Sequence, residues 1–188
     1  MKTGVIIPSR QLPKTGQTPS IIGFDDGHYY AGWWKGLTYL KNKERFIAKT
    51  LTEDDHDVVI DNATGLMWAG DGNKEGCNNG ATITWNNAMI AIAALNAADG
   101  FAGFKDWRMP NYIELFSLLV LDPALVIAVK PLIYEPPFDN TKRSPYLTST
   151  AHVETTTNAY LIPFTNAAGI GGSKAAMPAY LRLVRGGV

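Results

Sequence analysis

One short stretch, residues 106–115, constrains the fold of this chain more than any other part of its sequence. Asn111 precedes an apolar segment, and Glu114 follows three residues later. This is the spacing of a capping box, in which each side chain accepts the backbone N–H of the other residue. Pro110 disfavours helical geometry at Met109. The stretch therefore predicts a rigid extended arm over residues 106–110 that leads into a helix beginning at Asn111.

The rest of the regular structure is predicted from apolar periodicity and turn residues. A helix with Thr84 as its cap is expected to bury Trp85, Ala88, Met89, Ile92 and Leu95. The second helix, from Asn111 to about Leu121, should stop at Asp122-Pro123. The predicted strands are 58–60, 66–68, 146–150, 159–164 and 180–184, and the first helix spans 82–96. Strand, two helices and then several strands indicate an α+β domain.

The first fifty residues differ in character from the others. Residues 1–50 are rich in Gly, Pro and aromatic side chains and have no sustained helix or strand period, which indicates an extended N-terminal arm. Its aromatic side chains could cover the domain core, contact another subunit or bind a ligand. Residues 51–188 form the predicted folded domain.

Charge and cysteine content narrow the function classes. Lys+Arg and Asp+Glu number 17 each, so nothing favours nucleic acid or an anionic membrane as a partner. The single cysteine, Cys77, excludes an internal disulfide and a multi-cysteine metal site. No apolar segment approaches the roughly 20 residues of a membrane span, and the N-terminus lacks the apolar region of a signal peptide, so we expect neither membrane insertion nor a signal peptide.

Three segments in order resemble the Lcl C-terminal domain family, a bacterial domain family of unknown function. They are residues 61–68, residues 85–115, and residues 146–187 with their strands at 146–150, 159–164 and 181–184. Together they cover about residues 58–187. The chain departs from the family pattern at Leu147, where Trp is usual, and at residues 52–57, which replace an acidic, Gly-rich turn.

The resemblance implies a variant of the C-type-lectin-like fold, which is shared with formylglycine-generating enzymes. In that fold the first and last strands pair, which would bring residues 66–68 beside residues 181–184. The fold presents variable loops from a rigid scaffold. Fold alone does not determine function, so each chemistry needs its own residues.

The motif residues are predicted to be structural. The tryptophans would fill the core between helices and sheet, and the arginines would bind carbonyls or carboxylates such as Asp106 or Glu114 through forked donors. The predicted structural set is Trp68, Trp85, Asp106, Trp107, Arg108, Pro110, Asn111, Glu114 and Arg185.

A contact surface is expected instead in the loops after the second helix, at residues 134–146, 152–158 and 166–176. These loops are rich in Thr, Asn, Gly and Tyr, which combine adaptable polar groups with aromatic anchors. The candidate ligand-binding residues are Tyr134, Asn140, Arg143, Tyr146, His152, Asn158 and Asn166.

No catalytic residues, metal site or cofactor are predicted. One cysteine cannot supply the copper-binding pair of a formylglycine-type oxidase, and the sequence lacks a Ser-His-Asp order, a His-Glu-x-x-His run and a phosphate loop. The calcium motifs of lectins are also absent. The acidic residues that could still hold calcium are Asp25, Asp26, Glu53, Asp54, Asp55 and Asp57.

These observations favour a non-enzymatic recognition module, expected on the surface of a phage particle as a tail-fibre or receptor-binding protein. Its predicted partners are a host-surface glycan or protein and, through the arm, neighbouring virion subunits, in a homo-oligomer such as a trimer. The alternatives are a structural or decoration protein of a virion and an exported bacterial adhesin at the cell surface. An oxidase related to formylglycine-generating enzymes comes last.

Overall fold

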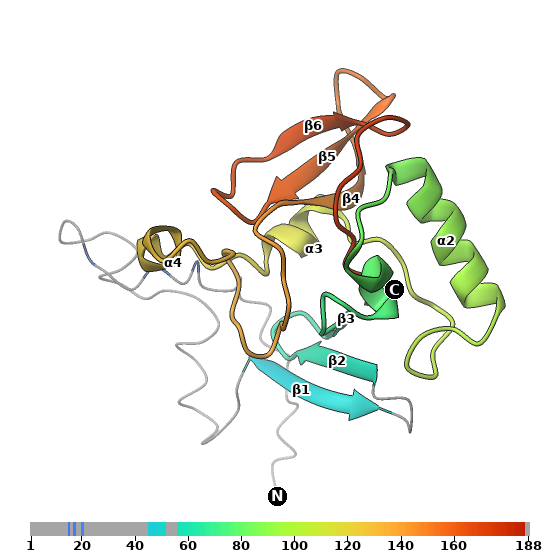
Figure 1. The fold of residues 1–188 in the computed structure, drawn as a ribbon, viewed down its shortest axis with the longest axis horizontal. Coiled ribbons are helices and arrows are strands. Elements are labelled where there is room, and N and C mark those ends of the chain that lie inside the picture. Colours follow the sequence, from blue (N-terminus) through green and yellow to red (C-terminus); the bar gives the residue numbers. More distant parts are fainter. Residues whose placement is uncertain (1–14, 16, 18–19, 21–44, 52–55, 187–188) are drawn as a thin grey trace, which may run out of the picture.

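The computed structural model describes residues 15, 17, 20, 45–51 and 56–186 as an α+β domain with two small antiparallel sheets (Figure 1). The predicted fold class is confirmed. The strands are β1 (Phe46–Leu51), β2 (His56–Asp61), β3 (Leu66–Ala69), β4 (Pro145–Ala151), β5 (Asn158–Pro163), β6 (Ile170–Ser173) and β7 (Val184–Arg185). The helices are the 3-10 segment η2 (Glu75–Gly80), α2 (Trp85–Ala97), α3 (Tyr112–Phe116) and α4 (Pro123–Ile127).

The first sheet has the order β1-β2-β3-β7. The predicted turn over residues 61–65 joins β2 to β3, and Gly65 there takes a positive φ of 75°. At the end of the chain β7 pairs with β3, placing Val184 opposite Trp68. The expected proximity of residues 66–68 to residues 181–184 is therefore confirmed.

β1 lies across the predicted boundary between residues 50 and 51. Residues 46–51 pair with β2 along their whole length, and Phe46 is buried in the core. Of the predicted arm, the structure otherwise describes only Arg45, Thr15, Gln17 and Ser20. The carbonyl of Thr15 accepts the N–H of Leu121 at 2.7 Å. The division into an arm and a domain remains a prediction.

The second sheet has the order β4-β5-β6 and stands above the first in Figure 1. Tyr146 and Ile162 are register partners, and a bulge interrupts the ladder between Leu147 and Ala151. The glycine-rich β6 was not predicted. The predicted strand over residues 180–184 is wrong in its extent, because this segment makes single bridges, such as Tyr146 with Tyr180, before β7 begins.

α2 and the helices after it differ in detail from the predictions. α2 begins at Trp85 after Thr84, but the Thr84 side chain makes no capping hydrogen bond. Ala88 and Ile92 are buried as predicted, whereas Met89 is exposed, so its assignment to the core face was wrong.

The predicted helix from Asn111 to Leu121 is wrong in length. α3 ends at Phe116, and the next residues, Leu118, Leu119 and Val120, are all buried. A helix buries one stripe of its surface, so three consecutive buried residues do not fit a continued helix. Asp122 then begins a new helix, α4, because its side chain accepts the N–H of Ala124.

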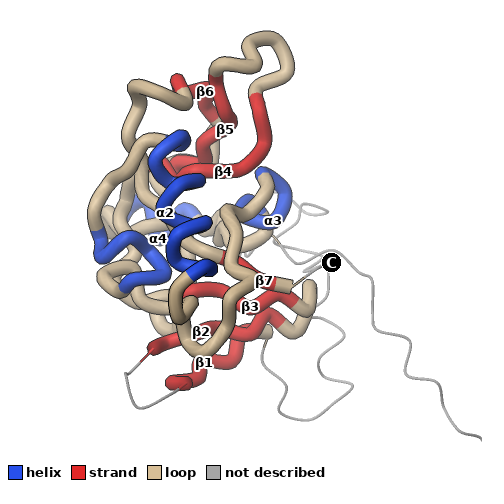
Figure 2. Tube along the Cα trace, turned by 90° about the vertical axis from the view of Figure 1, so that its right-hand side faces the viewer, coloured by secondary structure: helices blue, strands red, loops and turns tan. Residues whose placement is uncertain are grey.

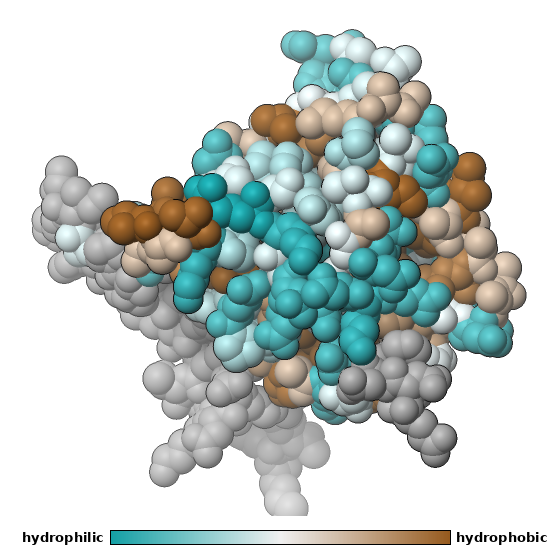
Figure 3. All heavy atoms as spheres, in the orientation of Figure 1, coloured by the Kyte–Doolittle hydropathy of each residue, from teal (hydrophilic) through white to brown (hydrophobic). Residues whose placement is uncertain are grey.

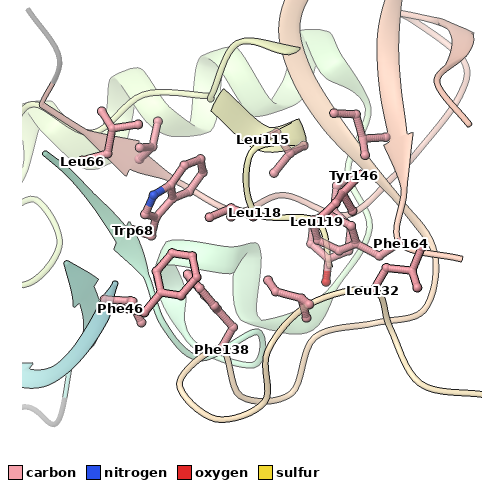
Figure 4. Close-up of a cluster of buried hydrophobic side chains, with 14 residues drawn as sticks. Phe46, Leu66, Trp68, Leu115, Leu118, Leu119, Leu132, Phe138, Tyr146 and Phe164 are labelled. Atoms are coloured by element: carbon pink, nitrogen blue, oxygen red, sulfur yellow. The ribbon is translucent and has the colours of Figure 1, made fainter. Parts of the chain in front are cut away.

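Two hydrophobic clusters make up the core. In the first, Trp68 of β3 and Leu115 of α3 point toward Leu118 and the rings of Tyr146 and Phe164 (Figure 4). The second lies under α2 and includes Trp107, Phe101 and Leu161, together with Leu147, Leu181 and Leu183. Trp68 and Trp107 are buried as predicted. Trp85 is only half-buried, and its indole N–H donates to the carbonyl of the buried Thr148 at 2.9 Å.

Candidate functional site

The first half of the 106–115 motif points into the protein. The Trp107 indole N–H donates to the carbonyl of Phe101 at 2.7 Å, and the Asn96 side chain bonds the backbone of Trp107 on both sides, donating to its carbonyl and accepting from its N–H. Arg108 exchanges two backbone hydrogen bonds with Val184. The arm is thus an extended segment joined to the C-terminal strand.

The charged groups of the motif bind one another. The two terminal guanidinium nitrogens of Arg108 donate to the carboxylate oxygens of Glu114 at 2.8 and 2.7 Å, and Glu114 also accepts the N–H of Asn111. The predicted capping box is complete, since Asn111 accepts the N–H of Glu114 at 2.8 Å. Burial raises the pKa of Glu114, but the hydrogen bonds and charge of Arg108 and the N–H of Asn111 outweigh it, so the pKa is lowered.

A second ion pair holds the start of the arm. Arg185 donates to the two carboxylate oxygens of Asp106 at 2.7 and 3.0 Å, and its guanidinium lies 3.8 Å from the ring centre of Phe104. The hydrogen bond from Arg185 lowers the pKa of Asp106. The predicted structural roles of Arg108 and Arg185 are therefore supported by their contacts.

The second half of the motif carries a row of aromatic rings, which we call the ring row. It consists of His152, Tyr160, Tyr112 and Phe116, with successive ring centres 4.7, 5.4 and 6.0 Å apart. α3 lies beside the second sheet (Figure 2), and the N–H of Tyr112 donates to the hydroxyl of Thr150 on β4. The four rings come from α3, from β5 and from the residue directly after β4, and they lie next to one another in a row. None of them is fully buried.

An open groove of about 490 Å³ lies at the two middle rings of this row and is lined by Asn111, Tyr112, Ile113, Thr150 and Tyr160. Its volume lies within the range of about 300–1,000 Å³ typical of ligand sites. Ile113 stands at its edge with 71% of its surface exposed. We take this groove as the candidate functional site.

Glycines keep space open around the ring row. A Cβ atom at Gly169 would lie 2.5 Å from the Tyr112 hydroxyl, and one at Gly171 would lie 3.1 Å from the ring of His152. Gly171 is also the strand partner of Tyr160. A larger residue at either position would displace a ring.

Of the predicted ligand-binding residues, His152 belongs to the ring row, and Asn158 begins β5 two residues before Tyr160. Asn140 donates to Asp71, and Asn166 accepts the N–H of Ala168. Arg143 is exposed in the segment before β4. The predicted residues thus lie in several places, and the structure does not unite them in one site.

Two tyrosines of the predicted set face the core. Tyr146 was expected on the surface, but it is buried against Phe164 and Tyr180 and its hydroxyl accepts the N–H of Lys142, so this assignment was wrong. Tyr134 is half-buried, with its ring 6.4 Å from that of Phe46.

Sequence reasoning missed Tyr112 and Tyr160. The available signal was strand alternation: Ala159 and Leu161 are buried, so Tyr160 between them must point to the opposite side of the sheet. Tyr112 gave a weaker signal, because the first residue of a helix can face either way.

A wider cleft of about 690 Å³ lies between α2 and the turn formed by η2. Its rim carries the carboxylates of Glu75 and Asp99 and the amides of Asn78 and Asn79 above an apolar floor. Asn78 and Asn79 both take positive φ angles, of 53° and 50°. Its lining contains no aromatic side chain, so it offers less for recognition than the groove.

Features of catalytic or metal chemistry are sparse in the described part of the chain. Cys77 is buried, and burial raises the pKa of its thiol, which disfavours the reactive thiolate. No three His, Cys, Asp or Glu side chains of the described residues gather in a way that could hold a metal ion. Asp57 accepts a hydrogen bond from Thr50, whereas the other proposed calcium ligands, residues 25, 26 and 53–55, lie outside the described residues.

Comparison with known families identifies the domain. The family model of the Lcl C-terminal domain matches residues 57–185, so the chain belongs to this family. No curated protein matches it. Among the described residues, no helix has the length and apolar character that a bilayer span requires.

Proposed function

We propose that this member of the Lcl C-terminal domain family is a non-enzymatic surface-recognition module that binds a glycan in the groove along the ring row. The observation that carries the proposal is the pair of adjacent rings, Tyr112 and Tyr160, that lines an open groove of about 490 Å³, with His152 and Phe116 extending the row on either side. Aromatic side chains at a surface supply rigid contact area at low entropic cost.

The chemistry of the groove suits a sugar. A pyranose has an apolar face of C–H groups, which packs on aromatic rings, and a polar edge of hydroxyl groups, which need hydrogen-bonding partners. Tyr112 and Tyr160 supply the rings, while Asn111 and Thr150 supply polar groups at the same groove. The arrangement combines both requirements of a sugar within one site.

The rigid base of the groove also supports recognition. Asn111 and Glu114 complete the capping box at the start of α3, and Thr150 ties Tyr112 to β4. Little freedom is then lost when a ligand binds, which favours affinity. The carboxylates of the motif are already occupied by arginines, which favours binding over acid–base catalysis at this place.

Glycan-array and whole-cell binding of the full chain would test the proposal, using Tyr160→Ala and Ile113→Asp as groove variants. Ile90→Asp is a matched control, because Ile90 is 68% exposed on α2 and lies outside the groove lining. We expect wild type and Ile90→Asp to bind the same glycans and both groove variants to lose most of the signal. Equal binding by all folded variants would reject the groove as the binding site.

A second candidate function, a structural protein that makes only protein contacts, is favoured by an apolar patch on α4. Ile127 of α4 and Val129 just after it are well exposed, and Val126 is half-exposed. Figure 3 shows hydrophobic residues in brown at the left of the molecule, where α4 lies in Figure 1. Leu121 lines the same shallow pocket as Val126 and Ile127, and its backbone N–H donates to the carbonyl of Thr15. Exposed apolar patches of this kind commonly mark protein contacts.

The mass of the particle in solution would test this alternative. If the patch holds a homo-oligomer, multi-angle light scattering should give a multiple of 20.5 kDa for wild type and a lower multiple for Ile127→Asp. The control is Val153→Asp, because Val153 lies outside α4 and is about as exposed as Ile127. This substitution should leave the mass unchanged. A monomeric wild type would reject the homo-oligomer.

The setting that we propose for the module is the surface of a phage particle, where sugar binding would attach the particle to its host. An exported adhesin could use the same groove. Mass spectrometry of purified particles and of the bacterial cell surface would separate the two settings, since the protein should be found in one fraction and not in the other.

A further inference from the structure

The lining of the groove carries no charge. Its described residues, Asn111, Tyr112, Ile113, Thr150 and Tyr160, are all uncharged. The charged residue nearest in sequence is Glu114, directly after Ile113, but its carboxylate is occupied by Arg108 and the N–H of Asn111. None of the described side chains that line the groove could therefore neutralise an anion.

The histidine at the end of the ring row lies against Tyr160 and over Gly171. Its Nδ1 accepts the backbone N–H of Glu154 at 3.3 Å. His152 thus extends the aromatic surface beyond the residues that line the groove.

The polar groups that remain available in the groove are neutral as well. Asn111 uses its side-chain oxygen for the N–H of Glu114, and no described residue accepts from its amide N–H groups. The Thr150 hydroxyl accepts from Tyr112, and no described acceptor takes its proton. Amide and hydroxyl donors suit the hydroxyl oxygens of a sugar, and neither can form an ion pair.

We infer that the groove selects uncharged pyranosides over sulfated or carboxylated ones. This inference rests on the proposed function and names the class of glycan that the same site takes. A sulfate or carboxylate in the groove would lose water without gaining a cation, and an unpaired charge that leaves water pays a large desolvation cost. Hydroxyl groups meet the available amide and hydroxyl donors at no such cost.

Matched pairs of sugars test the inference with the full chain. The probes are maltotriose, cellotriose and chitotriose, each as the free sugar and as its mono-O-sulfated derivative, with Kd measured by calorimetry. We expect at least one free sugar to bind and its sulfated form to bind at least about tenfold more weakly. Stacking and neutral hydrogen bonds are little screened, so Kd of the free sugar should change less than about twofold between low and high NaCl concentration.

A charge added to the groove provides the converse test. Ile113→Lys places an ammonium group at the groove edge, whereas Ile90→Lys places one on α2 as the control. We expect Ile113→Lys to tighten binding of the sulfated sugars at least about threefold and Ile90→Lys to leave it unchanged. Both substitutions are at exposed helix positions, so circular dichroism should report an intact fold.

The outcomes distinguish failure of the neutral selection from failure of glycan recognition itself. Sulfated sugars that bind wild type as tightly as the free sugars would overturn the neutral selection and leave glycan recognition standing. If neither form of any probe binds wild type, and the glycan array is also blank, both the selection and the proposed function are rejected.

Discussion

Two regions of this domain use a forked arginine–carboxylate pair, and they differ in where the pair lies. Arg45, just before β1, donates to both oxygens of Asp61 at 3.0 and 2.9 Å, and Asp61 is fully buried. In the 106–115 motif, the pair between Arg108 and Glu114 is half-exposed and Asp106 has 54% of its side chain exposed. The same kind of ion pair therefore lies in two different environments, one buried and one partly exposed to water.

The buried pair connects three parts of the chain. Arg45 also donates to the carbonyl of Ser117 after α3, while Asp61 accepts from the backbone of Ala63 and the hydroxyl of Thr64 in the β2–β3 turn. A buried ion pair contributes little net stability when whole, but removing one partner leaves an uncompensated charge. In the motif, we expect the buried side chain of Trp107 to contribute more to the free energy of unfolding than the two ion pairs do.

The largest effect is expected for Asp61→Ala, which removes the buried carboxylate that Arg45 binds. We predict a loss of about 4–5 kcal/mol in the free energy of unfolding, measured by urea denaturation. The double variant Arg45→Met/Asp61→Leu replaces the pair by apolar groups and should recover most of that loss. If the double variant is as unstable as the single one, the loss comes from the turn bonds rather than from the charge.

Trp107→Ala is expected to cost about 3–5 kcal/mol, because it empties the space between Phe101 and the leucines beneath α2. Trp85→Ala is the control, since Trp85 is half-buried and its removal should cost distinctly less. Thermal and urea denaturation of the two variants would measure the difference. A Trp107→Ala protein as stable as wild type would contradict the assignment of this ring to the core.

Glu114→Gln tests the half-exposed pair and should cost about 1 kcal/mol, reduced by solvent screening. The lowered pKa of Glu114 makes its contribution depend on pH: it is present above the ordinary value of 4.5 and is lost as pH falls through the folded value. The difference in unfolding free energy between wild type and Glu114→Gln should therefore shrink as pH is lowered below 4.5. A difference that stays constant down to pH values well below this would argue against the charge of Glu114 as its source.

The smallest effect is expected for Asp106→Asn, at less than about 0.5 kcal/mol. Asp106 is largely exposed, and Arg185 keeps its contact with the ring of Phe104 when the carboxylate is gone. Urea denaturation at low and high salt would measure it, and the small loss should vanish at high salt. A loss as large as that of Asp61→Ala would mean that solvent exposure does not determine how much these ion pairs contribute to the free energy of unfolding.

Local spacing was enough to predict part of this structure. Asn111 and Glu114 stand three residues apart, and one turn of helix brings them together whatever surrounds them, so the capping box followed from the sequence. The Arg108–Glu114 pair was within reach for the same reason. The Arg45–Asp61 pair was not predicted, because it joins the residue before β1 to the end of β2 across a hairpin whose first strand has no clear apolar period.

The residues that line the candidate groove could not be predicted from local spacing or composition. Loop composition indicated His152, but Tyr112 and Tyr160 join it only because α3 packs on β4 and β5. Tyr146, chosen by the same criterion of composition, is in the core. Composition reports which residues could recognise a ligand and says nothing about which of them reach the same surface.

The sequence by itself determined the family, the α+β class and the capped entry to α3, because these depend on residues close together in the chain or on patterns in order along it. Only the tertiary structure decided that the two halves of the 106–115 motif have different roles. Its first half is held inside by Trp107, and its second half turns Tyr112 outward beside Tyr160. Sheet register and helix packing set that arrangement, and both depend on contacts between residues far apart in the chain.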